Sequence, residues 1–172
     1  LLNLQIGTLI EIAFFVLYLS ALVIIAGIDK EKRQIEKSVL YYAIGILVLY
    51  IIYLCIIDKA SIYRYVMYLT TVMILLVIDT IHLKNKAKSS YLLSTLILLA
   101  IMIVFTGELV AILTIIMTLL IIALYILLMK IISDKKNIKK EKKNLAENLN
   151  IAFYLCTSNI IMLTLTLFII NW

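Results

Sequence analysis

The stretch from Tyr91 to Met129, YLLSTLILLAIMIVFTGELVAILTIIMTLLIIALYILLM, decides the class of fold. As one helix it would extend about 58 Å at about 1.5 Å per residue, whereas the hydrocarbon core of a bilayer is about 30 Å thick. Only helices and closed barrels satisfy their backbone hydrogen bonds in lipid, and this run is too long and continuous for barrel strands. The stretch therefore predicts two membrane-spanning helices that are separated near Thr106-Gly107-Glu108.

The rest of the chain has the same apolar character. Of its 172 residues, 65% are hydrophobic and 15% are charged, the mean hydropathy is +1.16, and there is no proline. A soluble globular domain has about 25% charged residues, so this class is excluded. We predict an all-α, polytopic membrane protein: a single transmembrane domain over residues 1–172, folded as a six-transmembrane-helix bundle. The six helices are expected at about 8–28, 38–57, 63–83, 89–106, 108–132 and 149–171.

The basic residues predict the orientation of the bundle. Fourteen of the sixteen lysines and arginines fall in or beside three of the breaks between apolar runs, namely Asp29 to Lys37, His82 to Lys88 and Lys130 to Lys143. Basic residues near the ends of spans stay on the cytoplasmic side during insertion. These breaks should therefore face the cytoplasm, with both termini outside. The tyrosines gather near the expected span ends, as aromatic residues with a polar tip do.

The net charge of +6 does not point to a nucleic acid, because the basic residues flank spans. The last of the three breaks, 130–148, is rich in lysine and is expected to be a cytoplasmic loop that is attracted to anionic lipid headgroups. We expect the lipid bilayer to be the partner of this chain, in a multi-pass protein of the cell membrane.

Several kinds of chemistry find no support in the residue pattern. The chain has one histidine, His82, and two cysteines, Cys55 and Cys156, so no zinc cluster is expected. No nucleophile has a neighbouring base that spacing reveals. No two glycines are close enough together to form a phosphate-binding loop. We therefore expect no metal and no organic cofactor.

Acidic residues within or beside the spans are the remaining candidates, because ionisable groups are costly in a membrane. Glu11, Asp79 and Glu108 lie within apolar runs, and Asp29 follows the first run. Glu11 and Glu108 fall near the outer side, where an interfacial acid costs little. Asp29 and Asp79 both fall at inner helix ends, so they could meet across the bundle. Two carboxyl groups that share a proton can activate water and protonate a leaving group, as in aspartic proteases.

The residues after the first span resemble a pattern of the type IV prepilin leader peptidases, membrane aspartic proteases that cut basic leader peptides from pilins. That family carries D-x-x-x-R-x-I-P-N after a core span. Here Asp29-Lys-Glu-Lys-Arg33-Gln-Ile35-Glu36-Lys37 has the aspartate, the arginine and the isoleucine at matching positions, and Glu36 replaces the proline. The span count, the outer N-terminus and the size are similar to the small peptidases of tight-adherence pilus systems.

The resemblance implies an endopeptidase at the cytoplasmic face in which Asp29 and Asp79 are catalytic, no cofactor is used and the partner is a pilin-like precursor with a basic leader. The family's second aspartate follows glycines in G-x-G-D, whereas Val77-Ile78 precede Asp79 here. The chain would therefore be either a working peptidase or a divergent, inactive member. Gly107-Glu108 is closer to this pattern by letters but is expected at the outer side.

The residues leave another class of function open. Acids in spans also line polar pathways, and the chain lacks a complete catalytic signature, which suits a non-enzymatic ligand-binding, transport or sensor membrane subunit. Transport sites commonly use helices that are broken by glycine or proline, and here only the break at Gly107 is marked in this way. A structural subunit of a larger membrane complex is a third interpretation.

Labelling in intact cells tests the orientation. In a chain whose native cysteines are replaced, Cys55→Ala and Cys156→Ala, a cysteine at Lys140 should react with a membrane-permeant maleimide and not with an impermeant one, because the charge rule predicts that it lies in the cytoplasm. Reaction of the Lys140→Cys variant with the impermeant reagent would reverse the orientation.

Overall fold

The computed structural model describes residues 7–82, 87–135 and 149–170. Within these ranges the chain forms six α-helices and one short 3-10 helix, and no strand. The predicted all-α fold with six helices is confirmed. The elements are α1 (Leu9–Lys32), α2 (Lys37–Ile57), η1 (Lys59–Ser61), α3 (Ile62–His82), α4 (Ala87–Thr106), α5 (Glu108–Lys135) and α6 (Ile151–Ile170).

Two residues with left-handed backbone conformations separate consecutive helices. Arg33 has a φ of 52°, and its N–H donates to the Asp29 carbonyl at 2.9 Å, which closes the last turn of α1. Gly107 has a φ of 82°, and its N–H donates to the Ile103 carbonyl at 2.9 Å. Glycine adopts this conformation without the steric cost that a β-carbon brings. The predicted break at Gly107 is therefore confirmed, although Gly107 itself is buried and Glu108 beyond it is exposed.

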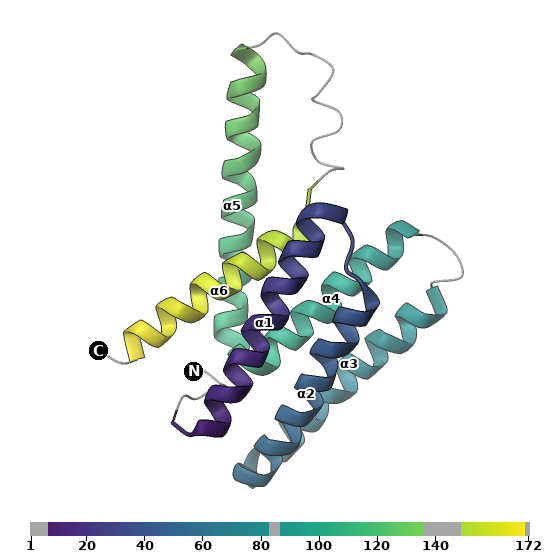
Figure 1. The fold of residues 1–172 in the computed structure, drawn as a ribbon, viewed down its shortest axis with the longest axis vertical. Coiled ribbons are helices and arrows are strands. Elements are labelled where there is room, and N and C mark those ends of the chain that lie inside the picture. Colours follow the sequence, from purple (N-terminus) through teal and green to yellow (C-terminus); the bar gives the residue numbers. More distant parts are fainter. Residues whose placement is uncertain (1–6, 83–86, 136–148, 171–172) are drawn as a thin grey trace.

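Helix α4 lies at the centre of the bundle. It packs against α2, α3, α5 and α6, and most of its side chains from Ile97 to Phe105 are buried. Helix α1 packs against α2 and α6, and α6 packs in turn on α5 (Figure 1). Helix α5 diverges from the other helices toward its C-terminal end (Figure 1), where its apolar side chains are exposed.

The helices alternate in direction, so α1 and α3 end, and α2, α4 and α6 begin, toward one end of the bundle (Figure 1). The charge rule predicts that this end lies in the cytoplasm, and we call it the inner end. The opposite end, where α1 begins and α6 finishes, is called the outer end.

The helices have the length and composition of membrane spans. Helices α1, α2, α3, α5 and α6 are each long and apolar enough to cross a membrane, and α4 has a shorter apolar stretch, Tyr91–Thr106. Most of the C-terminal half of α4 is covered by its neighbours, so its length need not match the bilayer as closely as that of a fully lipid-facing helix. The chain is an integral, multi-pass membrane protein whose surroundings are lipid.

Two expected boundaries differ from the structure by more than two residues. Helix α1 continues to Lys32, so Asp29 lies inside the helix and not in the following connection. Neither proline nor glycine occurs between Asp29 and Arg33, and lysine and glutamate are good helix formers, so nothing ends α1 earlier. Helix α5 likewise continues to Lys135, so the lysine-rich connection begins later than residue 130. The remainder of that predicted loop, 136–148, lies outside the described residues.

Hydrogen bonds from tyrosines to acids join the helices at the outer end. Tyr53 of α2 donates to Glu11 of α1 at 3.2 Å. Tyr68 of α3 donates to Glu108 of α5 at 2.7 Å. Glu11 also forms a capping box with Thr8 at the start of α1, which satisfies backbone N–H groups that a helix leaves unpaired. Both acids therefore join two helices at the expected membrane boundary.

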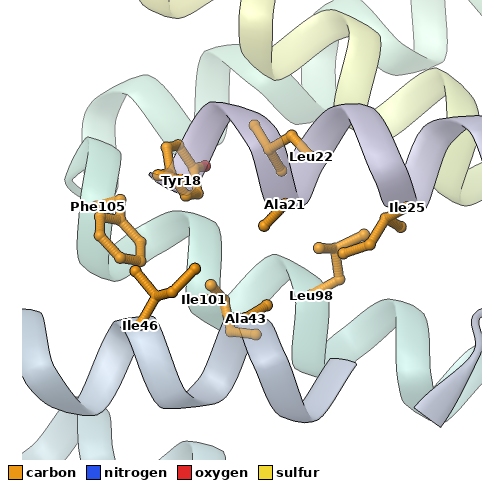
Figure 2. A pocket seen from close by; sticks show the side chains of 9 residues that line it. All are labelled: Tyr18, Ala21, Leu22, Ile25, Ala43, Ile46, Leu98, Ile101 and Phe105. Carbon is orange, nitrogen blue, oxygen red and sulfur yellow. The ribbon is translucent and has the colours of Figure 1, made fainter. Parts of the chain in front are cut away.

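Three stacked aromatic rings fill the centre of the bundle. Phe105 of α4 lies 4.3 Å from Tyr18 of α1 and 4.8 Å from Tyr50 of α2, measured between ring centroids. Beside this stack is a cavity of about 10 Å³ between α1, α2 and α4 (Figure 2). A single water needs roughly 10–15 Å³ and several polar partners, and this lining is almost entirely apolar. The cavity is therefore a packing defect and not a ligand site.

The tight packing around this cavity can be tested at Ala21 of α1, which is buried and lines it. Leucine adds more volume than the cavity offers, so Ala21→Leu should lower the free energy of unfolding by about 1–3 kcal/mol. Ala123→Leu, at an exposed position of α5, is the matched control and should have little effect. Denaturant titration in detergent micelles measures both. Equal stability of the two variants would contradict the tight packing of α1, α2 and α4 around the cavity.

Candidate functional site

The inner end of the bundle contains Asp29, which lies one turn before the end of α1 and is fully buried, with 0% exposure. Its Oδ2 accepts hydrogen bonds from the Phe153 backbone N–H at 2.8 Å and from the Tyr91 hydroxyl at 3.1 Å. The Tyr91 hydroxyl in turn accepts from the Ala152 N–H at 3.1 Å. Residues from α1, α4 and α6 therefore meet at one carboxyl group.

These contacts cap the N-terminus of α6. The first N–H groups of a helix have no partner within it, and Ala152 and Phe153 belong to the first turn of α6. The partial positive charge of a helix N-terminus also favours a nearby carboxylate. Asn150, just before the helix, donates from Nδ2 to the Lys30 carbonyl at 3.2 Å. Asp29 and its neighbour thus join the end of α1 to the start of α6.

Two acceptor atoms at this junction have no hydrogen-bond partner within the described ranges. They are Oδ1 of Asp29 and Oδ1 of Asn150, and both atoms are buried. Buried polar atoms are nearly always bonded, and the exceptions call for an explanation such as a functional role or a water site. One oxygen of Asp29 is therefore committed to the fold, and the other can still accept a proton or a hydrogen bond.

Asp79 lies at the same end of the bundle, one turn before the end of α3, and is only 3% exposed. Lys37, the first residue of α2, places its Nζ 3.6 Å from Asp79 Oδ2. A cation beside a buried acid offsets part of the cost of removing that acid from water. Asp79 therefore joins α3 to α2.

The two acids are bound crosswise. Asp29 precedes the connection between α1 and α2, yet its partner Tyr91 follows the connection between α3 and α4. Asp79 precedes the connection between α3 and α4, yet its partner Lys37 follows the connection between α1 and α2. Asp29 therefore joins α1 to α4, and Asp79 joins α3 to α2. These contacts hold the inner ends of the four helices together. The structure places both predicted site residues at this end, where they have different partners, and their joint action on one water stays a prediction.

The pattern that resembles the peptidase family shapes the turn between α1 and α2. Asp29 makes the bonds described above, Arg33 adopts the left-handed conformation that ends α1, and Ile35 is buried in the core. Glu36, which stands where the family has proline, forms an ion pair with Lys32 at 2.5 Å. Each matching position therefore has a structural role in this turn.

Sequence reasoning did not identify the partners of Asp29, because Tyr91 and the start of α6 are far from it along the chain. It also missed a buried polar contact in the middle of the bundle. Tyr18 of α1 donates to Asn159 Oδ1 of α6 at 2.7 Å, and Asn159 Nδ2 donates to Thr114 Oγ1 of α5 at 3.2 Å. A lone amide in an apolar span was the available signal, since polar groups in lipid bond to side chains on other helices.

In the parts of the chain that the structure describes, no three His, Cys, Asp or Glu side chains are grouped so that they could hold a metal ion. Comparison of the chain with protein-family models, with curated proteins and with solved structures finds no match. The functional interpretation therefore rests on the residues themselves and on their geometry.

The cap on α6 predicts how Asp29 variants differ in stability. Asp29→Ala leaves the Phe153 N–H and the Tyr91 hydroxyl without their acceptor, at a cost of about 1–3 kcal/mol for each buried group. Asp29→Asn keeps an accepting oxygen and should lose only about 1–2 kcal/mol from the missing charge at the helix N-terminus. Denaturant titration in detergent measures the difference. An alanine variant as stable as the asparagine variant would contradict the cap.

Proposed function

We propose that the chain is a membrane aspartic peptidase of the prepilin-leader-peptidase type, acting at the cytoplasmic end of the bundle with Asp29 and Asp79 as its catalytic pair. The observation that carries this proposal is the burial of Asp29 together with its unbonded carboxyl oxygen. It is a fully buried carboxyl group at the inner helix ends, and its Oδ1 has no hydrogen-bond partner in the described part of the chain. The pattern from Asp29 to Ile35 supports the same family.

The proposed chemistry uses only water and carboxyl groups. Asp29 Oδ1 accepts a proton from a water molecule, whose oxygen attacks the carbonyl carbon of the scissile bond. Asp79 donates a proton to the leaving amine. Exposed Glu31, two residues after Asp29, attracts the basic leader of a pilin-like precursor, whereas Glu36 is already paired with Lys32.

Cleavage requires that the inner end opens. The first turn of α6 and the Tyr91 side chain cover Asp29, so water and peptide reach it only when that turn moves away. Asp79 reaches a substrate only when it has moved away from Lys37, with which it forms an ion pair in the closed arrangement. In this proposal the closed arrangement is a resting state.

A second candidate function has its own support. Both acids are engaged in contacts between helices, Asp29 with α6 and Asp79 with α2. Such fixed groups suit a non-enzymatic ligand-binding, transport or sensor subunit, in which the two acids hold the inner helix ends and perform no chemistry. Cleavage of a precursor distinguishes the two candidates.

A pilin-like precursor with a basic leader, produced together with the wild-type chain, should be shortened. Asp29→Asn and Asp79→Asn should each lower the cleavage rate at least about 100-fold, because asparagine preserves volume but cannot transfer the proton. Asp58→Asn is the control, because Asp58 lies at the outer end and bonds to Tyr65 there. Gel analysis of the precursor gives the rate, and circular dichroism verifies that each variant is folded. An intact precursor beside wild-type chain, or equal cleavage by Asp29→Asn, would favour the second candidate.

A further inference from the structure

A groove between α4, α5 and α6 opens from the bundle toward lipid. It has a volume of about 420 Å³, and leucine and isoleucine side chains from all three helices form most of its lining. The two threonines in the lining donate to carbonyls of their own helices, Thr95 to Tyr91 at 2.8 Å and Thr118 to Thr114 at 2.7 Å. The groove therefore offers apolar contact and no free polar donor, so a hydrocarbon suits it.

The size of the groove favours a hydrocarbon chain over a helix as its occupant. A helix with its side chains is at least about 10 Å wide and rises about 5.4 Å per turn, so a volume of about 420 Å³ holds only about one turn. A hydrocarbon chain is thinner and needs no internal hydrogen bonds. An acyl chain of a membrane lipid therefore fits where a transmembrane helix does not.

The face of α5 that lines the groove continues along the helix to Lys130. Ile115, Leu119 and Ile122 line the groove at helical spacings of three and four residues. Steps of four continue this face through Ile126 to Lys130, and both side chains are exposed. Lys130 lies about 16 Å along the helix from Leu119, which is close to half of a hydrocarbon core about 30 Å thick. A lipid chain along the groove would therefore place its headgroup at the depth of Lys130.

We propose that this groove binds an anionic phospholipid, with one acyl chain between α4, α5 and α6 and its phosphate at Lys130. A lysine near the membrane surface favours an anionic over a zwitterionic headgroup by about five-fold. The flexible stem of Lys130 extends toward the interface while its methylene groups stay against apolar surface. The site does not depend on the proposed peptidase activity.

Quenching of tryptophan fluorescence by brominated lipids tests the site. Leu119→Trp and Leu120→Trp are each introduced into a chain in which the single tryptophan is replaced, Trp172→Phe. Leu119 is 61% exposed and lines the groove, whereas Leu120 is 54% exposed at nearly the same depth. One residue along a helix rotates the side chain by about 100°, so Leu120 is the matched control. The vesicles are phosphatidylcholine with equal fractions of brominated phosphatidylglycerol or brominated phosphatidylcholine.

The expected result is selective quenching in the groove. Brominated phosphatidylglycerol should associate with the Leu119→Trp site about five-fold more strongly than brominated phosphatidylcholine, and Lys130→Gln in the same chain should remove this preference. Leu120→Trp should be quenched equally by both lipids. Equal quenching at Leu119→Trp, or a preference that survives Lys130→Gln or appears at Leu120→Trp, would overturn the proposal. Native mass spectrometry of the unmodified protein is a second measurement, and equal retention of both lipids would also overturn it.

Discussion

The hydrogen bond from the Phe153 N–H to the Asp29 carboxyl closes the bundle, and the arrangement of the inner end depends on it. The first N–H groups of a helix have no partner within it, and where the first turn is buried by other helices, as at Ala152, their partners must come from the protein. For α6 the partner comes from α1, and Tyr91 of α4 extends the cap to the Ala152 N–H. One buried carboxyl therefore fixes three helices relative to one another. Without it, the start of α6 would need another acceptor or would fray.

Four acids of this bundle have the same kind of hydrogen-bond donor. Glu11, Asp29, Asp58 and Glu108 each accept a hydrogen bond from a tyrosine. A tyrosine suits the membrane boundary because its ring is apolar, its hydroxyl is polar, and it adds no second charge that must be removed from water. Four of the tyrosines near the span ends are therefore also donors that join helices, namely Tyr53, Tyr65, Tyr68 and Tyr91. Asp79 and Glu36 have a different kind of described partner, the ammonium groups of Lys37 and Lys32 respectively.

Features that depend on local sequence could be predicted, and features that depend on packing could not. Span length, apolar composition and one glycine are enough to separate α4 from α5 at Gly107. The end of α1 depends on Arg33, a residue without the backbone freedom of glycine, and no local pattern indicates its left-handed conformation. The candidate acids could be assigned to one end of the bundle from charge alone. Their partners could not, because the contact between Asp29 and Tyr91 is set by how α1 and α4 pack.

The capping role of Asp29 and a catalytic role are compatible in energy, although they exclude each other in any one arrangement. Moving the first turn of α6 away replaces bonds to Asp29 and Tyr91 with bonds to water, at a net cost of about 0.5–1.5 kcal/mol for each. An opening of this size corresponds to a minor state that is populated at roughly 0.1–10%. Hydrogen bonds within the protein can be replaced by bonds to water only at the membrane boundary, where water molecules are present. Asn159, bonded to Tyr18 in the middle of the bundle, has no such replacement, so its contact can only be structural. The position of Asp29 along the membrane normal, more than its burial, therefore allows it to have both roles.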